Sequence, residues 1–194
     1  TNEVFRKFIL TTDGLQSKTS IDGGKTYSDD QGVRYQLREE DKGSIGYYDT
    51  FNNNKGQIVL LYIGAFGHSD ENIRLAISED NGETFEFKSA NPLNDAGLSS
   101  QGGDHRDPRV TLLSDGSLRL FSMVQGAQGA PIPGTRSAGS IYSHSSTDGG
   151  YTWTLDEGVR LSKDDFDFPV WSLNDPHVVR LADGRFRMYV TALI

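Results

Sequence analysis

The chain has 194 residues, no cysteine and a formal net charge of -8 at pH 7. The absence of cysteine excludes disulfides and thiolate metal sites, and the acidic balance disfavours nucleic acid as a partner. With 35% hydrophobic residues and no long apolar run, the sequence predicts a soluble globular protein that does not enter a membrane. The compartment is not indicated, because a start at Thr1 fits a mature secreted form, a trimmed chain or a fragment.

All the elements that the sequence predicts are short strands separated by turn residues, and we find no helical periodicity. The segment Gln57–Ile63 is nearly all apolar, which is typical of a strand covered on both faces. The predicted strands are residues 4–10, 15–20, 32–37, 47–51, 57–63, 72–78, 85–87, 109–113, 118–124, 140–145, 175–181 and 186–193, with a further strand beginning at residue 153.

An eight-residue pattern, Ser-x-Asp-x-Gly-x-Thr-aromatic, which we call an octad, occurs three times. Octad 1 is Ser20–Tyr27, octad 2 is Ser78–Phe85 and octad 3 is Ser146–Trp153. The pattern predicts a hairpin turn, because the Asp carboxylate accepts backbone N–H groups and Gly supplies a positive φ. The closing aromatic is expected to pack between layers. We assign a structural role to the shared positions Ser20, Asp22, Gly24, Thr26, Tyr27, Ser78, Asp80, Gly82, Thr84, Phe85, Ser146, Asp148, Gly150, Thr152 and Trp153.

A second feature recurs at a regular distance from the octads. Asp49, Asp107 and Asp175 each lie 27 residues after an octad Asp. The last two begin the similar segments Asp-Pro-Arg-Val and Asp-Pro-His-Val. The repeat length of roughly 60 to 70 residues indicates a repeat protein. Four short strands and one aromatic motif per repeat are typical of a β-propeller, so we expect an all-β propeller fold.

The repeats divide a single domain, residues 1–194, into about three blade-equivalents. The blades are expected at about residues 1–42 (partial), 43–97, 98–165 and 166–194 (partial). Because propellers need about four to eight blades to close, we expect two chains to form one six-bladed ring as a homodimer. The alternative is that the chain is a piece of a longer protein. One feature opposes a simple exchange of blades: residues 4–10 can themselves be a second strand, duplicating residues 186–193.

The octads resemble the Asp-box, or BNR, repeats of sialidases and related six-bladed propellers. The segments His105–Val110 and Trp171–Pro176 resemble the Arg-Asp-Pro and Asn-Asp-Pro segments of five-bladed glycoside hydrolases. These resemblances imply a sialidase-like propeller that acts on carbohydrate. The chain departs from both families: it has no early Arg-Ile-Pro segment, no assignable Tyr-Glu pair and no Glu in the sequence context of the five-bladed enzymes.

The first strand of each blade lines the channel of a propeller, and its start is expected to open onto the ligand face. Asp107, Asp175 and Asp49 are candidate catalytic carboxyls, because glycoside hydrolysis needs two carboxyl groups, one of them protonated. The alternative is that an Asp at a strand start only caps backbone amides. Candidate ligand-binding residues beside them are Tyr48, Asp104, His105, Arg106, Arg109, Trp171, Asn174 and His177.

The sequence thus predicts a carbohydrate-active propeller, related to glycoside hydrolases or sialidases and acting at the channel mouth. The alternative is a non-catalytic, self-assembling half-propeller that binds a glycan or a protein. We expect no cofactor and no metal, because the four histidines show no metal-ligand spacing. The acidic segment Asp164–Asp167 is more typical of a solvated loop than of a cation site. The expected partners are a second copy and a carbohydrate, without nucleic acid or membrane.

Overall fold

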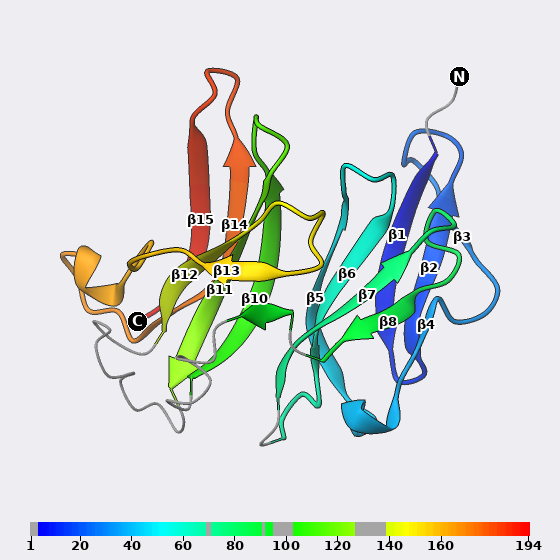
Figure 1. The fold of residues 1–194 in the computed structure, drawn as a ribbon, viewed down its shortest axis with the longest axis horizontal. Coiled ribbons are helices and arrows are strands. Elements are labelled where there is room, and N and C mark those ends of the chain that lie inside the picture. Colours follow the sequence, from blue (N-terminus) through cyan, green and yellow to red (C-terminus); the bar gives the residue numbers. More distant parts are fainter. Residues whose placement is uncertain (1–3, 69–70, 91, 95–102, 127–138) are drawn as a thin grey trace.

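The computed structural model describes residues 4–68, 71–90, 92–94, 103–126 and 139–194, and it is built from four β-sheets whose strands are antiparallel except for one parallel pair (Figure 1). Sheet 1 holds β1 to β4, sheet 2 holds β5 to β8, sheet 3 holds β10 to β13 with β9, and sheet 4 is the hairpin β14–β15. The strands are β1 (Phe5–Thr11), β2 (Gly14–Ser20), β3 (Ser28–Asp29), β4 (Tyr35–Gln36), β5 (Ile45–Asn52), β6 (Ile58–Gly64), β7 (Asn72–Ser78), β8 (Glu86–Ser89), β9 (Leu93–Asn94), β10 (Gly103–Leu112), β11 (Leu118–Gly126), β12 (Ser140–Ser146), β13 (Trp153–Leu155), β14 (Ser172–Arg180) and β15 (Phe186–Leu193).

The all-β prediction is confirmed, and sheet 2 has the expected four strands in the order β5-β6-β7-β8. The helical turns described, η1 (Glu39–Asp41) and η3 (Lys163–Asp165), are short 3-10 turns. No helix in the described ranges is long and apolar enough to span a membrane. One unexpected strand is β9, which pairs in parallel with β13.

Sheet 1 has no counterpart of the first strand of sheet 2 among the described residues. Its octad follows β2, as octad 2 follows β7, and β2 pairs with β1 as β7 pairs with β6. β1 therefore occupies the second-strand position, which β15 also occupies in sheet 4. From the sequence, residues 4–10 can be a second strand like residues 186–193, and the strand pairing confirms this.

The core consists of apolar layers between successive sheets. Strand β6 contributes to two of them because neighbouring side chains of a strand point to opposite faces. Leu60 and Tyr62 pack with residues of sheet 1, and Val59 and Leu61 pack with Trp153 and other residues of sheet 3. These four β6 side chains are all 0% exposed, which explains the continuous apolar run predicted to be a doubly covered strand. A third layer joins sheets 3 and 4 and includes Phe121, Met123, Ile141 and Leu173.

The three octads form the same turn, as their sequence predicts. In octad 2, Ser78 Oγ accepts the N–H of Gly82 at 2.7 Å, and Asp80 accepts the N–H and hydroxyl of Thr84 at 2.9 and 2.6 Å. The corresponding Ser–Gly and Asp–Thr hydrogen bonds recur in octads 1 and 3. The closing aromatics differ: Phe85 and Trp153 are 8% and 0% exposed and pack against the preceding sheet, whereas Tyr27 is 42% exposed. The expected interlayer packing is therefore found in octads 2 and 3 only.

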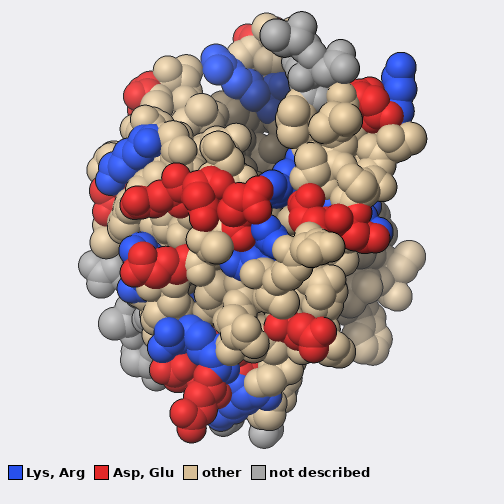
Figure 2. All heavy atoms as spheres, turned by 90° about the vertical axis from the view of Figure 1, so that its right-hand side faces the viewer, with Lys and Arg blue, Asp and Glu red and all other residues tan. Residues whose placement is uncertain are grey.

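The hairpins and the strand starts of the sheets lie at opposite ends of the molecule. The hairpins β5–β6, β10–β11 and β14–β15 lie at one end, at the top of Figure 1, and β5, β10 and β14 begin at the other. Strand β10 lies between β5 and β14. On the side of the molecule that holds sheet 1, acidic side chains form a band across the middle, with basic side chains beside it (Figure 2).

Candidate functional site

The starts of β5, β10 and β14 bring three irregular backbone positions together. Each strand has a register shift against its neighbour, and at that shift Tyr47, Asp107 and Asp175 have φ values of 26°, 53° and 51°. Positive φ is uncommon for residues other than glycine and is concentrated at turns and functional sites. The shared irregularity identifies these three residues as counterparts.

This correspondence corrects the register that the spacing of 27 residues predicts. Asp49 is not the counterpart of Asp107 and Asp175, because Tyr47 holds that position in β5. Two residues farther along each strand come Asp49, Arg109 and His177, which line a pocket of about 120 Å³ with Val110 and Val178. The predicted catalytic carboxyls thus lie at two successive positions along the first strands, with Asp49 two residues farther along its strand than the counterpart of Asp107 and Asp175.

Asp107 is the most buried of the three predicted carboxylates, with 3% of its surface exposed. Its Oδ2 accepts the backbone N–H of Asp175 at 3.2 Å, and its Oδ1 is buried without a hydrogen bond from any described residue. Burial raises the pKa of Asp107, and the neighbouring charge of Asp175 raises that pKa further. Asp107 also lines a pocket of about 150 Å³ with Tyr47, Arg106 and Asn174. This carboxyl therefore combines burial, a raised pKa and a pocket.

Asp49 connects two sheets. Its Oδ2 accepts the backbone N–H of Val110 at 2.7 Å, while Arg109 Nη1 donates to the carbonyl of Tyr48 at 2.8 Å. Burial raises the pKa of Asp49. Because both contacts join β5 to β10, Asp49 and Arg109 position the two first strands in addition to lining the pocket of about 120 Å³.

Trp171 and Asn174, two predicted ligand-binding residues, lie just before β14 and at its start, respectively. The Trp171 side chain is 79% exposed, and its backbone N–H donates to Leu193 at 2.6 Å. Asn174 accepts the Ser172 hydroxyl at 2.7 Å and lines the same pocket as Asp107. An exposed indole can stack on the C–H face of a sugar.

Two predicted ligand-binding residues, His105 and Tyr48, have other surroundings. His105 is 1% exposed, its Nδ1 lies 2.8 Å from Ser122 Oγ, and its ring meets that of His144 edge-on at 4.8 Å. This corrects the expectation that His105 faces a ligand, because the ring lies inside sheet 3. Tyr48 donates its hydroxyl to the carbonyl of Phe8 at 2.7 Å and so faces sheet 1. The side chain of Asp104 lies outside the described part of the structure.

The structure adds one carboxylate that the sequence patterns do not indicate. Glu71 is 3% exposed, and its Oε1 lies 2.9 Å from Arg106 Nε, while its Oε2 accepts the N–H of Gly67 at 2.9 Å. Arg106 in turn lines the Asp107 pocket. Glu71 belongs to no repeated segment, so only its two contacts bring it to the site. Within the described ranges no cluster of His, Cys, Asp or Glu has the arrangement of a metal site.

No protein-family model and no curated protein matches this sequence. Solved structures do resemble it. A thermostable family-43 glycoside hydrolase superposes with a TM-score of 0.66 at 15% identity, over 98% of this chain and 61% of its own. A putative exo-β-1,3-galactanase from Bifidobacterium bifidum S17 gives 0.62 at 14%, over 94% and 56%. The GH93 α-L-arabinofuranosidase of Fusarium graminearum gives 0.56 at 17%, over 92% and 48%.

The fold resembles the β-propeller fold of these glycoside hydrolases. At these identities the likeness concerns the fold, and this chain spans about half to three fifths of the length of those structures. Sheet 2, with four antiparallel strands in sequence order, has the strand arrangement expected of one propeller blade. The starts of β5, β10 and β14 are the starts of three successive first strands.

Proposed function

We propose that the chain is the glycan-recognising part of a carbohydrate-active propeller, and that Asp107 is a catalytic carboxyl of a glycoside hydrolase reaction. The observation that carries the proposal is the buried Asp107 carboxyl with its raised pKa, in a pocket shared with Arg106 and Asn174. A protonated carboxyl is what a general acid needs to give a proton to the leaving glycosidic oxygen. The enzymatic names of the similar structures favour the same reaction class.

The roles of the other residues follow from their positions. Asp175, beside Asp107 and exposed, is the proposed second carboxyl. Trp171 is proposed to stack on a sugar ring, and Arg106 and Asn174 to hydrogen-bond hydroxyls. Asp49, Arg109 and His177 lie two residues farther along the first strands and are proposed to contact a ligand only if it reaches into the channel.

The test is turnover of aryl α-L-arabinofuranosides and β-D-galactosides by the purified chain. Asp107→Asn keeps an acceptor for the Asp175 N–H and is expected to lower turnover at least about 100-fold. The control is Asp183→Asn in the exposed β14–β15 hairpin, which is expected to retain full turnover. Loss of turnover in both variants, or in neither, would overturn the catalytic assignment.

A binding function without catalysis is the second candidate, for a glycan or for a protein. It is favoured by Asp49 and Asp107, which each use one carboxylate oxygen to hold the backbone of the next sheet. Titration of the chain with the same glycosides, followed by NMR or calorimetry, separates the candidates. Saturable binding without turnover would support a glycan-binding module, and Trp171→Ala should then abolish it.

The expected homodimer remains a proposal about assembly, together with the Asp-box identity of the octads. A groove of about 530 Å³ between β1 and β5, lined by Phe5, Phe8 and Phe51, is where a first strand of sheet 1 would lie. In a six-bladed ring of two chains, β14 of the partner would enter this groove. Because β1 and β15 hold the same position, the partner's β15 would have to give way. Light scattering tests the ring: twice 21.4 kDa supports it, and a single chain mass contradicts it.

A further inference from the structure

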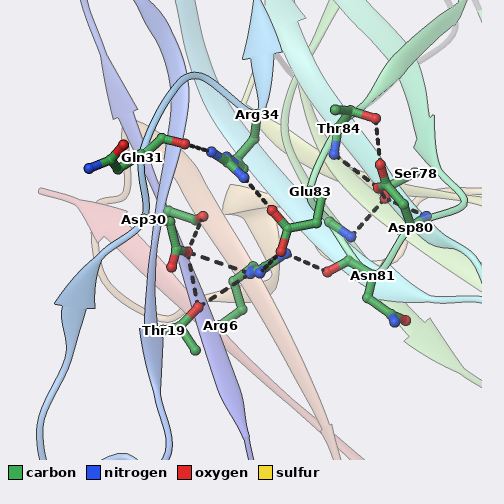
Figure 3. Close-up of polar contacts among 12 residues, drawn as sticks. Arg6, Thr19, Asp30, Gln31, Arg34, Ser78, Asp80, Asn81, Glu83 and Thr84 are labelled. Atoms are coloured by element: carbon green, nitrogen blue, oxygen red, sulfur yellow. Dashed lines mark hydrogen bonds and ion pairs between the residues drawn. The ribbon is translucent and has the colours of Figure 1, made fainter.

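Octad 2 is anchored to sheet 1 by a pair of arginines (Figure 3). Arg34 Nη1 donates to Glu83, the sixth residue of octad 2, at 2.6 Å, and the Arg6 guanidinium contacts the other oxygen of the same carboxylate. Arg6 also donates to the carbonyl of Asn81, the fourth octad residue, at 2.7 Å. One octad carboxylate thus joins two arginines of the preceding sheet.

The two arginines are held in place by groups of sheet 1 itself. Asp30 accepts the hydroxyls of Ser17 and Thr19 at 2.5 and 3.0 Å and lies 3.6 Å from Arg6 Nε. Arg34 Nη2 donates to the carbonyl of Gln31. Contacts within sheet 1 therefore orient the side chains of Arg6 and Arg34 toward octad 2.

Sheet 3 repeats this arrangement residue for residue. Asp156 accepts the hydroxyls of Ser143 and Ser145 at 2.6 and 2.7 Å and lies 3.3 Å from Arg119 Nε. Arg119 pairs with Ser145 across β11 and β12, as Arg6 pairs with Thr19 across β1 and β2. Arg160 donates to the carbonyl of Glu157, which follows Asp156. Arg34 likewise donates to the carbonyl of Gln31, which follows Asp30.

The two arginine pairs differ in what covers them. Arg34 is 7% exposed beneath octad 2, whereas Arg160 is exposed, and the Arg119 side chain is 38% exposed against 18% for Arg6. Sheet 4, which packs on sheet 3, consists of β14 and β15 and carries no octad in its described residues. The Glu83 carboxylate lies between Arg6 and Arg34. No described residue places a carboxylate at the corresponding position between Arg119 and Arg160.

We propose that Arg119 and Arg160 form a docking site for an octad whose sixth residue is Asp or Glu, carried by a strand that pairs with the open edge of β15. The strand would extend sheet 4 as β7 extends β6 in sheet 2. The carboxylate of the sixth octad residue would bridge the two guanidinium groups. The backbone carbonyl of the fourth octad residue would accept a hydrogen bond from Arg119. This inference does not depend on the proposed catalytic function.

The octads of this chain do not supply the acidic residue. Their sixth residues are Lys25, Glu83 and Tyr151; Glu83 is already bound, and Tyr151 contacts Gln57 and Lys55 of sheet 2. A second copy arranged as in the two-chain ring would place Lys25 against the two arginines, and like charges disfavour that contact. The occupant is therefore a polypeptide segment of different sequence, with an acidic octad.

The experiment uses the 194-residue chain and a synthetic peptide with the sequence of residues 72–89, which contains octad 2 and its flanking strands. A control peptide carries Glu83→Lys. The readout is the arginine Nε–Hε NMR signals of the chain, assigned with Arg119→Lys and Arg160→Lys. The Glu peptide is expected to shift the Arg119 and Arg160 signals and to bind about tenfold more tightly than the Lys peptide. In the chain variant Arg160→Glu this preference should reverse.

Equal affinities for the two peptides, or shifts confined to other arginines, would overturn the proposal. If neither peptide binds, a second measurement decides, in which residues 72–89 are joined to the C-terminus through a flexible linker. The joined chain with Glu should then unfold at a higher temperature than the one with Lys, and Arg160→Glu should cancel the difference. No difference between the joined chains would also overturn it. A two-chain mass without peptide binding would assign this edge to the second copy instead.

Discussion

Arg74 and Asp41 form an ion pair in which both side chains are almost completely buried. Arg74 Nη1 lies 2.7 Å from Asp41 Oδ1, and the two side chains are 5% and 0% exposed. Asp41 also lies 3.3 Å from the hydroxyl of Tyr62, which lies 2.6 Å from the hydroxyl of Tyr35. The network joins η1 to β4, β6 and β7, so it fixes the connection that leads from sheet 1 into β5.

Removing one partner of this pair is expected to destabilise the chain strongly. Arg74→Ala leaves the Asp41 carboxylate buried without its cation and should lower the free energy of unfolding by about 3–5 kcal/mol. Arg38→Ala is the matched control, because Arg38 pairs with Glu40 at an exposed position and its loss should destabilise the chain far less than Arg74→Ala. Urea denaturation of both variants checks the prediction, and similar losses would contradict it.

Two glycines with positive φ are expected to tolerate alanine differently. At Gly56, with φ of 76°, a Cβ would meet nothing within 4 Å, so Gly56→Ala should cost only the backbone strain of about 1 kcal/mol. At Gly82, with φ of 83°, the Cβ would lie 2.7 Å from the Phe8 ring. Gly82→Ala should therefore cost about 1–3 kcal/mol more. Thermal unfolding of the pair measures the difference, and equal costs would show that Phe8 yields freely.

The octad aspartates are expected to make the chain sensitive to acid. The hydroxyl and N–H of Thr84 lower the pKa of Asp80 to about 2, and those of Thr26 lower the pKa of Asp22. A carboxyl whose pKa is lowered in the folded state adds stability above its unfolded pKa of about 4, and that stability is lost as the pH falls toward 2. In NMR titration Asp80 should protonate near pH 2, and Thr84→Val should move this step toward 4. Protonation near pH 4 in the unsubstituted chain would contradict the prediction.

The sequence predicts the features of the fold that depend on neighbouring residues. The octad hydrogen bonds join residues two to four positions apart, as those of Ser78, Asp80 and Thr84 do, and they form as predicted. The apolar run of β6 likewise predicts its double burial. Contacts between sheets are not readable in this way: Arg6 and Glu83 are 77 residues apart, and no local pattern marks them as partners.

At the candidate site the spacing of the repeats is informative but not sufficient. It identifies Asp107 and Asp175 as equivalent, and their shared positive φ agrees. It places Asp49 with them, because counting residues does not show that the irregular position of β5 falls at Tyr47. The burial of His105 depends on the register of β10 against β11, which the residue type alone does not determine.

Asp49 provides a test of whether its charge or its hydrogen bond matters to the fold. Burial raises the pKa of Asp49, so its ionised form is disfavoured in the folded state. Asn keeps an oxygen that accepts the Val110 N–H and carries no charge. Asp49→Asn should therefore stabilise the chain at pH 7, by about 1 kcal/mol or less.

The advantage should vanish below pH 4, where Asp49 is neutral in both states, and grow as the pH rises through its folded pKa. Urea denaturation at pH 3.5 and 7 measures this, with Asp49→Leu, which removes the acceptor, as the control that should destabilise at both. A loss of stability at pH 7 with Asn would mean that the charge itself holds β5 to β10 beside Arg109.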